Sequence, residues 1–210
     1  MCGRYELIDG QRVFLRFNIT TTAPLLRDGV PDNLDVRPSQ QVAAVVGDQV
    51  LRLMQWGLVP FWAKDATIGH KLINARAEGI AEKPSFKRPL RSQRCILPAS
   101  AFFEWRAAPG AKTKTKYRIG RRDGELFGLA GLYDTWTSAK NGADAATTLT
   151  TCTIITTTPN AVVAPIHDRM PVILRPEDEA DWLNPDLSEP EEIVTFLRPY
   201  PEEWLEARVA

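Results

Sequence analysis

The chain has 210 residues, 44% of them hydrophobic, which is typical of one globular domain with a substantial core. Charged residues interrupt the N-terminal segment and no apolar run approaches about 18 residues, so the sequence predicts neither a signal peptide nor a membrane span. The three cysteines, Cys2, Cys95 and Cys152, are widely spaced and odd in number, as is typical of reduced thiols in a cytosolic or nuclear protein. With two histidines and no C-x-x-C motif, we expect no metal site and no cofactor.

The formal net charge of zero hides a division along the chain. Residues 1–122 carry 21 Lys and Arg against 10 Asp and Glu, a net charge of +11. Residues 123–210 carry 5 against 16, a net charge of −11. This asymmetry allows a basic face that holds nucleic-acid phosphates. Mutual neutralisation of the two halves across one core explains the asymmetry equally well.

The first third of the chain predicts one short helix and three strands. After a strand-like N-terminal segment, Asp9 is expected to cap a short helix with three apolar residues on one face: Val13, Phe14 and Phe17. Residues 18–35 are expected to form a loop. Strands are expected at 42–46 and 51–56, joined by a tight turn at 47–48.

The middle of the chain begins with a rigid aromatic loop at 56–62 and an exposed segment at 64–71. Residues 72–78 are expected to begin a helix that ends near Pro84, and a basic segment follows. Further strands are expected at 95–98, 101–105, 117–119, 126–132 and 149–156, with another that ends at Leu174.

Two acid-rich stretches, 176–183 and 189–197, predict short helices because helix N-termini favour acidic side chains. A turn is expected at 108–110 and a polar surface loop at 137–148. Many strands with scattered short helices indicate an α+β fold with a closed or nearly closed mixed sheet.

Cys2 is chemically unusual because it follows the initiator Met1. Removal of Met1 leaves Cys2 with a free α-amine and a thiol, with reference pKa values of about 8 and about 8.5. Such a 1,2-aminothiol condenses with an aldehyde: the amine forms an imine, and the thiolate then closes a five-membered thiazolidine ring. An incidental cysteine in a disordered terminus is the alternative interpretation.

Two internal residues are candidates for acid–base chemistry. Glu104 lies in Phe102-Phe103-Glu104-Trp105, where strand alternation places its side chain on the face opposite Phe103 and Trp105. A buried carboxyl group has a raised pKa, which suits proton transfer near neutral pH, whereas an edge-strand glutamate faces water. His167 is a natural proton shuttle, although a lone histidine is more often structural.

Other residues also have two interpretations each. Asn74 either caps a helix or places an amide in a site. Arg4, Arg76 and Arg169 are either surface charges or phosphate ligands. Trp62 belongs either to the core or to a platform on which bases stack.

Five stretches, in this order and spacing, resemble the SRAP family, the SOS response-associated peptidases. They are Met1-Cys2-Gly3-Arg4-Tyr5, Trp56-Gly57-Leu58-Val59-Pro60 through Trp62, Asn74-Ala75-Arg76-Ala77-Glu78, Phe102-Phe103-Glu104-Trp105 and Ile166-His167-Asp168-Arg169-Met170-Pro171. The resemblance covers nearly the whole chain. It implies a single domain over residues 1–210, with an α+β fold built on a distorted mixed or antiparallel β-barrel flanked by short helices. The chain departs from the family at Asp35-Val36-Arg37-Pro38, where an Asn-Val-Ala-Pro-like segment is usual.

The resemblance implies a sensor of abasic sites in single-stranded DNA that crosslinks to the ring-opened aldehyde. Cys2 would be the nucleophile and Asn74 would position or polarise the reacting groups. Glu104 would act as acid and base, and His167 would assist imine formation, ring closure and reversal. DNA contacts are implied for Arg4, Pro38, Trp62, Arg76 and Arg169.

Two alternative functions stay open. One is a thiol peptidase in which His167 activates Cys2, with activity limited in one form to removal of the leader before Cys2. The other is a non-covalent DNA-binding module in which Cys2 is idle. For the crosslinking protein we also expect lyase-like activity on abasic sites. We expect a monomer that uses no metal, binds no membrane and lies in the cytoplasm, at the nucleoid in a bacterium.

Overall fold

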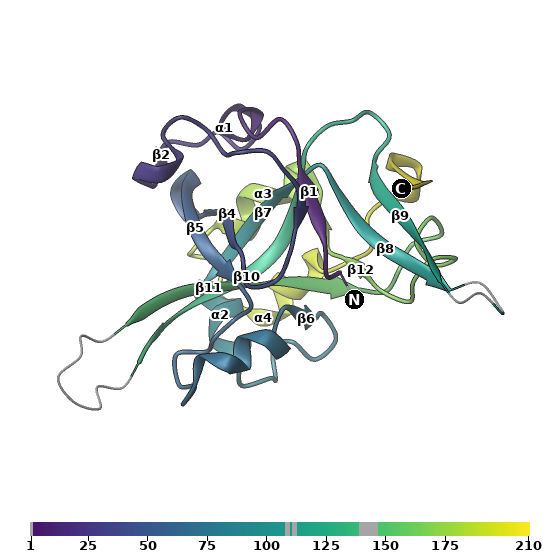
Figure 1. The fold of residues 1–210 in the computed structure, drawn as a ribbon. Coiled ribbons are helices and arrows are strands. Elements are labelled where there is room, and N and C mark those ends of the chain that lie inside the picture. The colour runs from purple at the N-terminus through teal and green to yellow at the C-terminus, as the bar shows by residue number, and fades with distance from the viewer. Residues whose placement is uncertain (1, 108–109, 111–112, 139–146) are drawn as a thin grey trace.

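The structure, a computed structural model, describes residues 2–107, 110, 113–138 and 147–210. Figure 1 shows a body of strands from which two hairpins, β8–β9 and β10–β11, extend in opposite directions. One sheet has the spatial order β14 (Leu205–Val209), β9 (Lys114–Arg121), β8 (Ala101–Ala107), β1 (Tyr5–Leu7) and β3 (Asn33–Val36). The N-terminus lies between the two hairpins in this view.

The second sheet closes on itself to form a barrel. Its order is β12 (Met170–Pro171), β11 (Thr148–Thr157), β10 (Phe127–Thr137), β7 (Arg94–Ala99), β4 (Gln41–Val46), β5 (Val50–Trp56) and β2 (Thr21–Thr22). A parallel pairing between β11 and β5, with Thr151 opposite Gln55 and Cys152 opposite Trp56, joins the ends of the five central strands. β13 (Ile173–Leu174) pairs with β10, and β6 (Asn74–Arg76) pairs with β11. The expected α+β fold with a distorted mixed barrel is therefore confirmed.

Strand alternation divides the barrel residues between two cores. Along β4, Val42, Ala44 and Val46 pack into one cluster, which also contains Cys2 and Trp56. Ala43 and Val45 face the other cluster, which the short helices cover. Both faces of these strands are thus buried, which explains why the strands are nearly continuous apolar runs.

The helices are short and lie around the barrel. They are α1 (Arg12–Arg16), α2 (Lys87–Ser92), α3 (Glu179–Leu183) and α4 (Pro190–Ile193). Trp182 of α3 is fully buried in the helix-covered core. Across the described residues, no helix has the length and apolar character that crossing a membrane requires.

Three sequence-based expectations are wrong. Residues 74–76 form the strand β6 rather than a helix, because their main chain pairs in parallel with residues 154–156 of β11. Gln11, not Asp9, is the N-cap of α1, and Asp9 instead adopts a positive φ of 59°. The expected loop at 18–35 contains β2 and most of β3. The expected loops at 108–110 and 137–148 lie partly outside the described residues.

Candidate active site at the N-terminal cysteine

Pairing between β1 and β8 brings the N-terminal segment to the centre of the site. Tyr5 lies opposite Phe102, and the Phe103 N–H donates to the Arg4 carbonyl at 2.9 Å. The chain before β1 therefore runs beside β8, and Cys2 is fully buried. Burial, and secondarily the nearby charge of Glu104, raise the pKa of the Cys2 thiol far above its usual range. Cys2 is thus a protonated thiol that needs a base before it can act as a nucleophile.

Glu104 provides a carboxyl group in this environment. It lies on β8 between β9 and β1, and only 2% of it is exposed, so it is not an edge-strand residue that faces water. Burial, with a smaller contribution from the charge of Asp168, raises the pKa of Glu104 to about 7. A carboxyl group with this pKa can both donate and accept a proton near neutral pH. The predicted buried face and raised pKa are both found.

His167 faces Glu104 from the turn before β12. Its Nε2 lies 3.8 Å from Glu104 Oε2, and its Nδ1 accepts a hydrogen bond from the Arg169 N–H at 3.0 Å. Asp168 Oδ1 lies 3.1 Å from the same Nδ1. Burial lowers the pKa of His167, so the ring is mainly neutral at neutral pH. The His167 imidazole and the Glu104 carboxyl group are therefore neighbours in the site.

Asn74 lies on β6, opposite Ile154 of β11. Its Nδ2 donates to the Ile73 carbonyl at 3.0 Å. Its Oδ1 is buried and has no hydrogen-bond partner within the described part of the chain. Because a buried acceptor is costly to leave unsatisfied, this oxygen is available for a ligand N–H or O–H group. Ile154, which pairs with Asn74, belongs to the same core cluster as Cys2. β6 therefore lies along this core.

The predicted DNA-contacting residues have different environments. Arg4 has its Nε 3.4 Å from Asp35 Oδ1 and its guanidinium 5.6 Å from the ring centroid of Trp105. Arg37 also binds Asp35, and this hydrogen bond is the main cause that lowers the pKa of Asp35. The departure from the family at residues 35–38 thus forms a local charge cluster. Pro38, the last residue of this segment, is half-buried.

Arg76 and Trp62 are accessible, whereas Arg169 is held by the protein. Trp62 is 48% exposed and Arg76 is also exposed. Both guanidinium Nη atoms of Arg169 donate to the Glu78 carboxylate at 2.7 and 2.8 Å, and Nη2 also donates to the Thr156 carbonyl at 2.7 Å.

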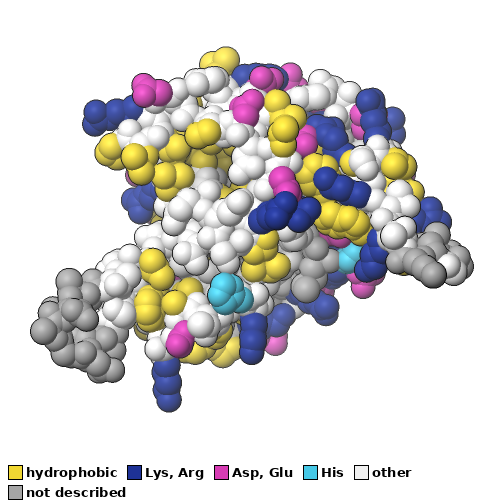
Figure 2. All heavy atoms as spheres, in the orientation of Figure 1, with side chains coloured by type: hydrophobic (Ala, Val, Ile, Leu, Met, Phe, Trp, Pro, Cys, Tyr) yellow, Lys and Arg dark blue, Asp and Glu magenta, His cyan; other side chains and the backbone are white. Residues whose placement is uncertain are grey.

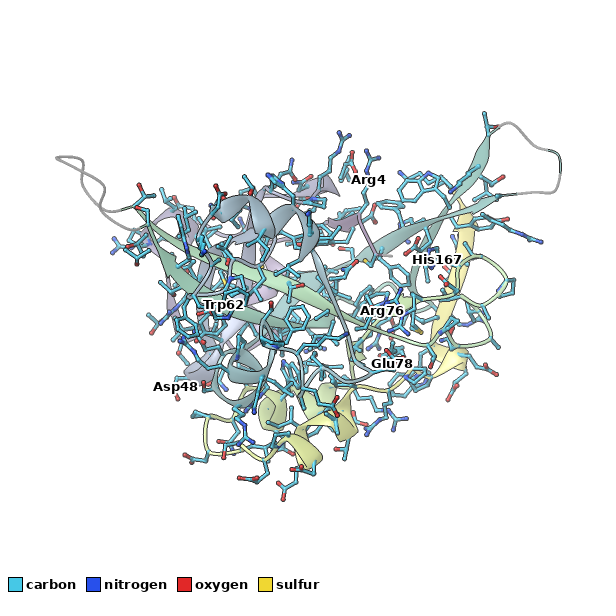
Figure 3. The ribbon with its side chains drawn as sticks, turned by 90° about the horizontal axis from the view of Figure 1, so that it is seen from below. Arg4, Asp48, Trp62, Arg76, Glu78 and His167 are labelled. Carbon is cyan, nitrogen blue, oxygen red and sulfur yellow. The ribbon has the colours of Figure 1, made fainter. Side chains whose placement is uncertain are left out.

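Figure 3 shows Arg4, Arg76, Glu78 and His167 on one side of the molecule, with Trp62 farther away. Figure 2 shows Lys and Arg side chains at several points of one face, with hydrophobic side chains between them. The structure thus brings Cys2, Glu104 and His167 together and leaves Trp62 at a distance. Across the described residues, no three His, Cys, Asp or Glu side chains lie close enough together to hold a metal ion.

Comparison with known proteins places this geometry in a family. The profile described as SOS response associated peptidase (SRAP) matches residues 1–209. The chain belongs to the SRAP family. It is 43% identical over 211 residues to the abasic site processing protein YoqW of Bacillus subtilis, and the match covers 99% of this chain and 91% of that protein.

The chain is also similar to a vertebrate SRAP relative and to a protein of known structure. The abasic site processing protein HMCES of Gallus gallus is 31% identical over 184 residues, which cover 78% of this chain and 54% of that protein. A crystal structure of a protein from Bacteroides thetaiotaomicron superposes with a TM-score of 0.88 at 32% identity and covers 99% of this chain and 91% of that one.

The motifs of this SRAP chain do not by themselves indicate the partners of its site residues. Glu78 lies within the Asn74–Glu78 motif, but its ion pair with Arg169 joins residues far apart in sequence. Asp168 is next to His167 in sequence, and this proximity alone could have suggested its contact with the imidazole. Nothing in the sequence pattern indicates which side chains hold the loop that carries Trp62.

Proposed function

We propose that this SRAP protein recognises abasic sites in single-stranded DNA and forms a covalent crosslink to them through Cys2. The buried Glu104, with its pKa of about 7 beside Cys2 and His167, carries this proposal. The names of the relatives, abasic site processing proteins, support it. We also propose that residues 1–210 act as one domain and as a monomer, without a metal ion.

The reaction needs the α-amine of Cys2, so Met1 has to be removed first. The amine then attacks the carbonyl carbon of the ring-opened abasic sugar. The carbonyl oxygen leaves as water, which yields an imine. The Cys2 sulfur next adds to the imine carbon while its proton passes to the nitrogen, which closes the thiazolidine ring. The net change is one aldehyde and one aminothiol converted to one thiazolidine and one water, with no oxidant.

The acid and the base of these steps come from the buried pair. Protonated Glu104 can donate to the sugar oxygen during ring opening and to the departing hydroxyl. Ionised Glu104 can accept the thiol proton of Cys2, whose raised pKa makes a base necessary. His167 can return protons to Glu104 through the 3.8 Å approach of its Nε2. Asn74 can accept a hydrogen bond from the reacting amine or from a sugar hydroxyl through its buried Oδ1.

DNA contacts would surround this centre. Arg4 and Arg76 would bind phosphates, Trp62, which lies farther from Cys2, would stack against a base next to the lesion, and Pro38 would pack beside the strand. Arg169 stays a proposed phosphate ligand. Its contribution should be smaller than that of Arg76, because Glu78 already shares its guanidinium.

Removal of the leader before Cys2 by the protein itself, and lyase-like strand cleavage at abasic sites, are further proposed activities. A general thiol peptidase, in which His167 would activate the Cys2 thiol directly, has less support, since the base proposed for this thiol is Glu104. The ring nitrogen Nε2 of His167 also lies against Glu104.

Denaturing electrophoresis tests the proposal. Trimmed protein mixed with abasic single-stranded DNA should give a complex that survives SDS, whereas undamaged DNA of the same sequence should give none. If both DNAs bind under native conditions and neither complex survives SDS, the protein is a non-covalent binding module and the proposal is overturned.

A further inference from the structure

The loop that carries Trp62 is held by one face of the β10–β11 hairpin. Three alternate residues of the loop have main-chain groups bonded to hairpin side chains. The Val59 N–H donates to Thr151 Oγ1 at 2.8 Å, and the Phe61 N–H donates to Asp134 Oδ2 at 2.9 Å. The Ala63 carbonyl accepts from Trp136 Nε1 at 2.7 Å.

The three anchoring side chains share a face because of the strand register. Asp134 on β10 lies directly opposite Thr151 on β11, and Trp136 is two residues along β10. All three are buried. Since the main-chain groups of 59, 61 and 63 are bonded to the hairpin, the loop presents Trp62 outward, where its side chain is 48% exposed.

Asp134 is the best-satisfied member of this set. Besides the Phe61 N–H, its carboxylate accepts from the Thr135 N–H at 2.8 Å and from Arg88 Nη2 at 3.1 Å. The Arg88 guanidinium in turn lies 4.3 Å from the ring centroid of Phe61. A buried carboxylate with several donors rigidifies the segment that supplies them.

We propose that Thr151, Asp134 and Trp136 are positioning residues that fix Trp62 as a preorganised stacking platform for single-stranded DNA. The inference rests on the proposed function, in which Trp62 contacts a base next to the lesion. Because the hairpin orders the loop before DNA arrives, binding does not have to order it. Loosening the anchors should therefore weaken binding through Trp62 alone.

The test measures non-covalent affinity for single-stranded DNA that contains a tetrahydrofuran abasic analogue, which has no aldehyde and cannot crosslink. Trp136→Phe removes the indole donor, and Thr151→Val removes the hydroxyl acceptor. Each should weaken binding about fivefold, as expected for one hydrogen bond. In a Trp62→Ala background neither should weaken binding further, because contacts that act through one residue are not additive.

Two variants serve as matched controls. Trp182→Phe removes an equivalent buried indole hydrogen bond, which goes to the Cys95 carbonyl at 2.9 Å and not to the loop. Thr153→Val replaces another buried hydroxyl of β11, one that has no hydrogen-bond partner in the described part of the chain. Both should leave DNA affinity unchanged.

The outcomes separate the inference from the proposed function. If Trp136→Phe and Thr151→Val reduce DNA affinity by the same factor in the wild-type and Trp62→Ala backgrounds, the positioning role is overturned. The stacking role of Trp62 would then stand. If Trp62→Ala binds as tightly as wild type, both roles are overturned, and crosslinking by Cys2 is still tested independently on aldehyde-bearing DNA. Should Trp136→Phe fail to fold, as judged by thermal melting, the isosteric Thr151→Val decides alone.

Discussion

At the residue scale, the proposed chemistry depends on a carboxyl group that burial keeps partly protonated at neutral pH. Glu104 lies near Cys2 and His167 on the strand beside β1, and burial is the main cause of its raised pKa. The same burial keeps the Cys2 thiol protonated, so acid and nucleophile depend on each other. Residues with strongly perturbed pKa values in one place are typical of catalytic sites.

Replacing Glu104 by glutamine should slow crosslinking without weakening DNA binding. Glu104→Gln keeps the shape of the side chain but removes the titrating proton, and loss of a general acid–base group costs about 10²–10⁴ in rate. Single-turnover crosslinking, followed by denaturing gel, and affinity for the tetrahydrofuran analogue measure the two effects. An unchanged rate would show that Glu104 is only structural.

The same variant should reveal the cost of burying Glu104. Its pKa is about 7 in the folded protein against an ordinary value of 4.5, so the folded state binds more protons between these values. The free energy of unfolding therefore falls as pH rises through this window. The difference in free energy of unfolding between Glu104→Gln and wild type should therefore shift by about 3 kcal/mol in favour of the variant as pH rises from about 4 to about 8. Denaturant titrations of both proteins measure this difference, and a difference that does not change with pH contradicts the assigned pKa.

At the element scale, β6 and the turn before β12 are joined by side chains as well as by β11. Glu78 follows β6, Arg169 follows His167, and their ion pair connects the two motifs. Arg169 also donates its main-chain N–H to the His167 ring. The ion pair therefore helps to fix the imidazole that faces Glu104.

Glu78→Gln should loosen this connection. Because more than half of the Glu78 side chain is exposed, the loss should be modest, up to about fivefold in crosslinking rate. The neighbouring exposed Glu82→Gln is the control and should have no effect, since no ion pair of Glu82 is found in the described residues. Equal rates for both variants would mean that the Glu78–Arg169 pair does not support His167.

The same elements show what the sequence could and could not predict. The barrel strands were predictable because 42–46 is an apolar run buried on both faces, and because 51–56 carries buried apolar residues on a strand with an exposed Arg52. β6 was not, because this three-residue strand is defined by main-chain pairing to a distant strand. Cys2, Glu104 and His167 were recognisable from their motifs. The anchors of the Trp62 loop were not, since Asp134 and Trp136 each lie 73 residues from the groups that they bind.

At the scale of the whole molecule, the charge division is partly neutralised by ion pairs and leaves some cations without one in the described residues. Ion pairs such as Arg16–Glu179 and Arg88–Asp134 neutralise the basic half with the acidic half. Lys64, Lys71 and Arg76 have no ion pair within the described residues. These unpaired cations are free to bind phosphates.

Non-covalent DNA affinity should therefore fall with increasing salt. Arg76→Ala should reduce the slope of log affinity against log salt by about one unit, because one phosphate contact is lost. Trp62→Ala should lower affinity but leave this slope unchanged, since stacking releases no counterion. An affinity that does not depend on salt would contradict the role of the basic residues.

Intact mass spectrometry of the protein after incubation with abasic single-stranded DNA tests the crosslink most directly. The account predicts an adduct equal to the trimmed protein plus DNA minus one water, with no adduct on protein that retains Met1. The Cys2→Ser variant should form only an imine, which borohydride traps but heat destroys. A heat-stable adduct on Cys2→Ser, or equal crosslinking by protein that retains Met1, would contradict thiazolidine formation at Cys2.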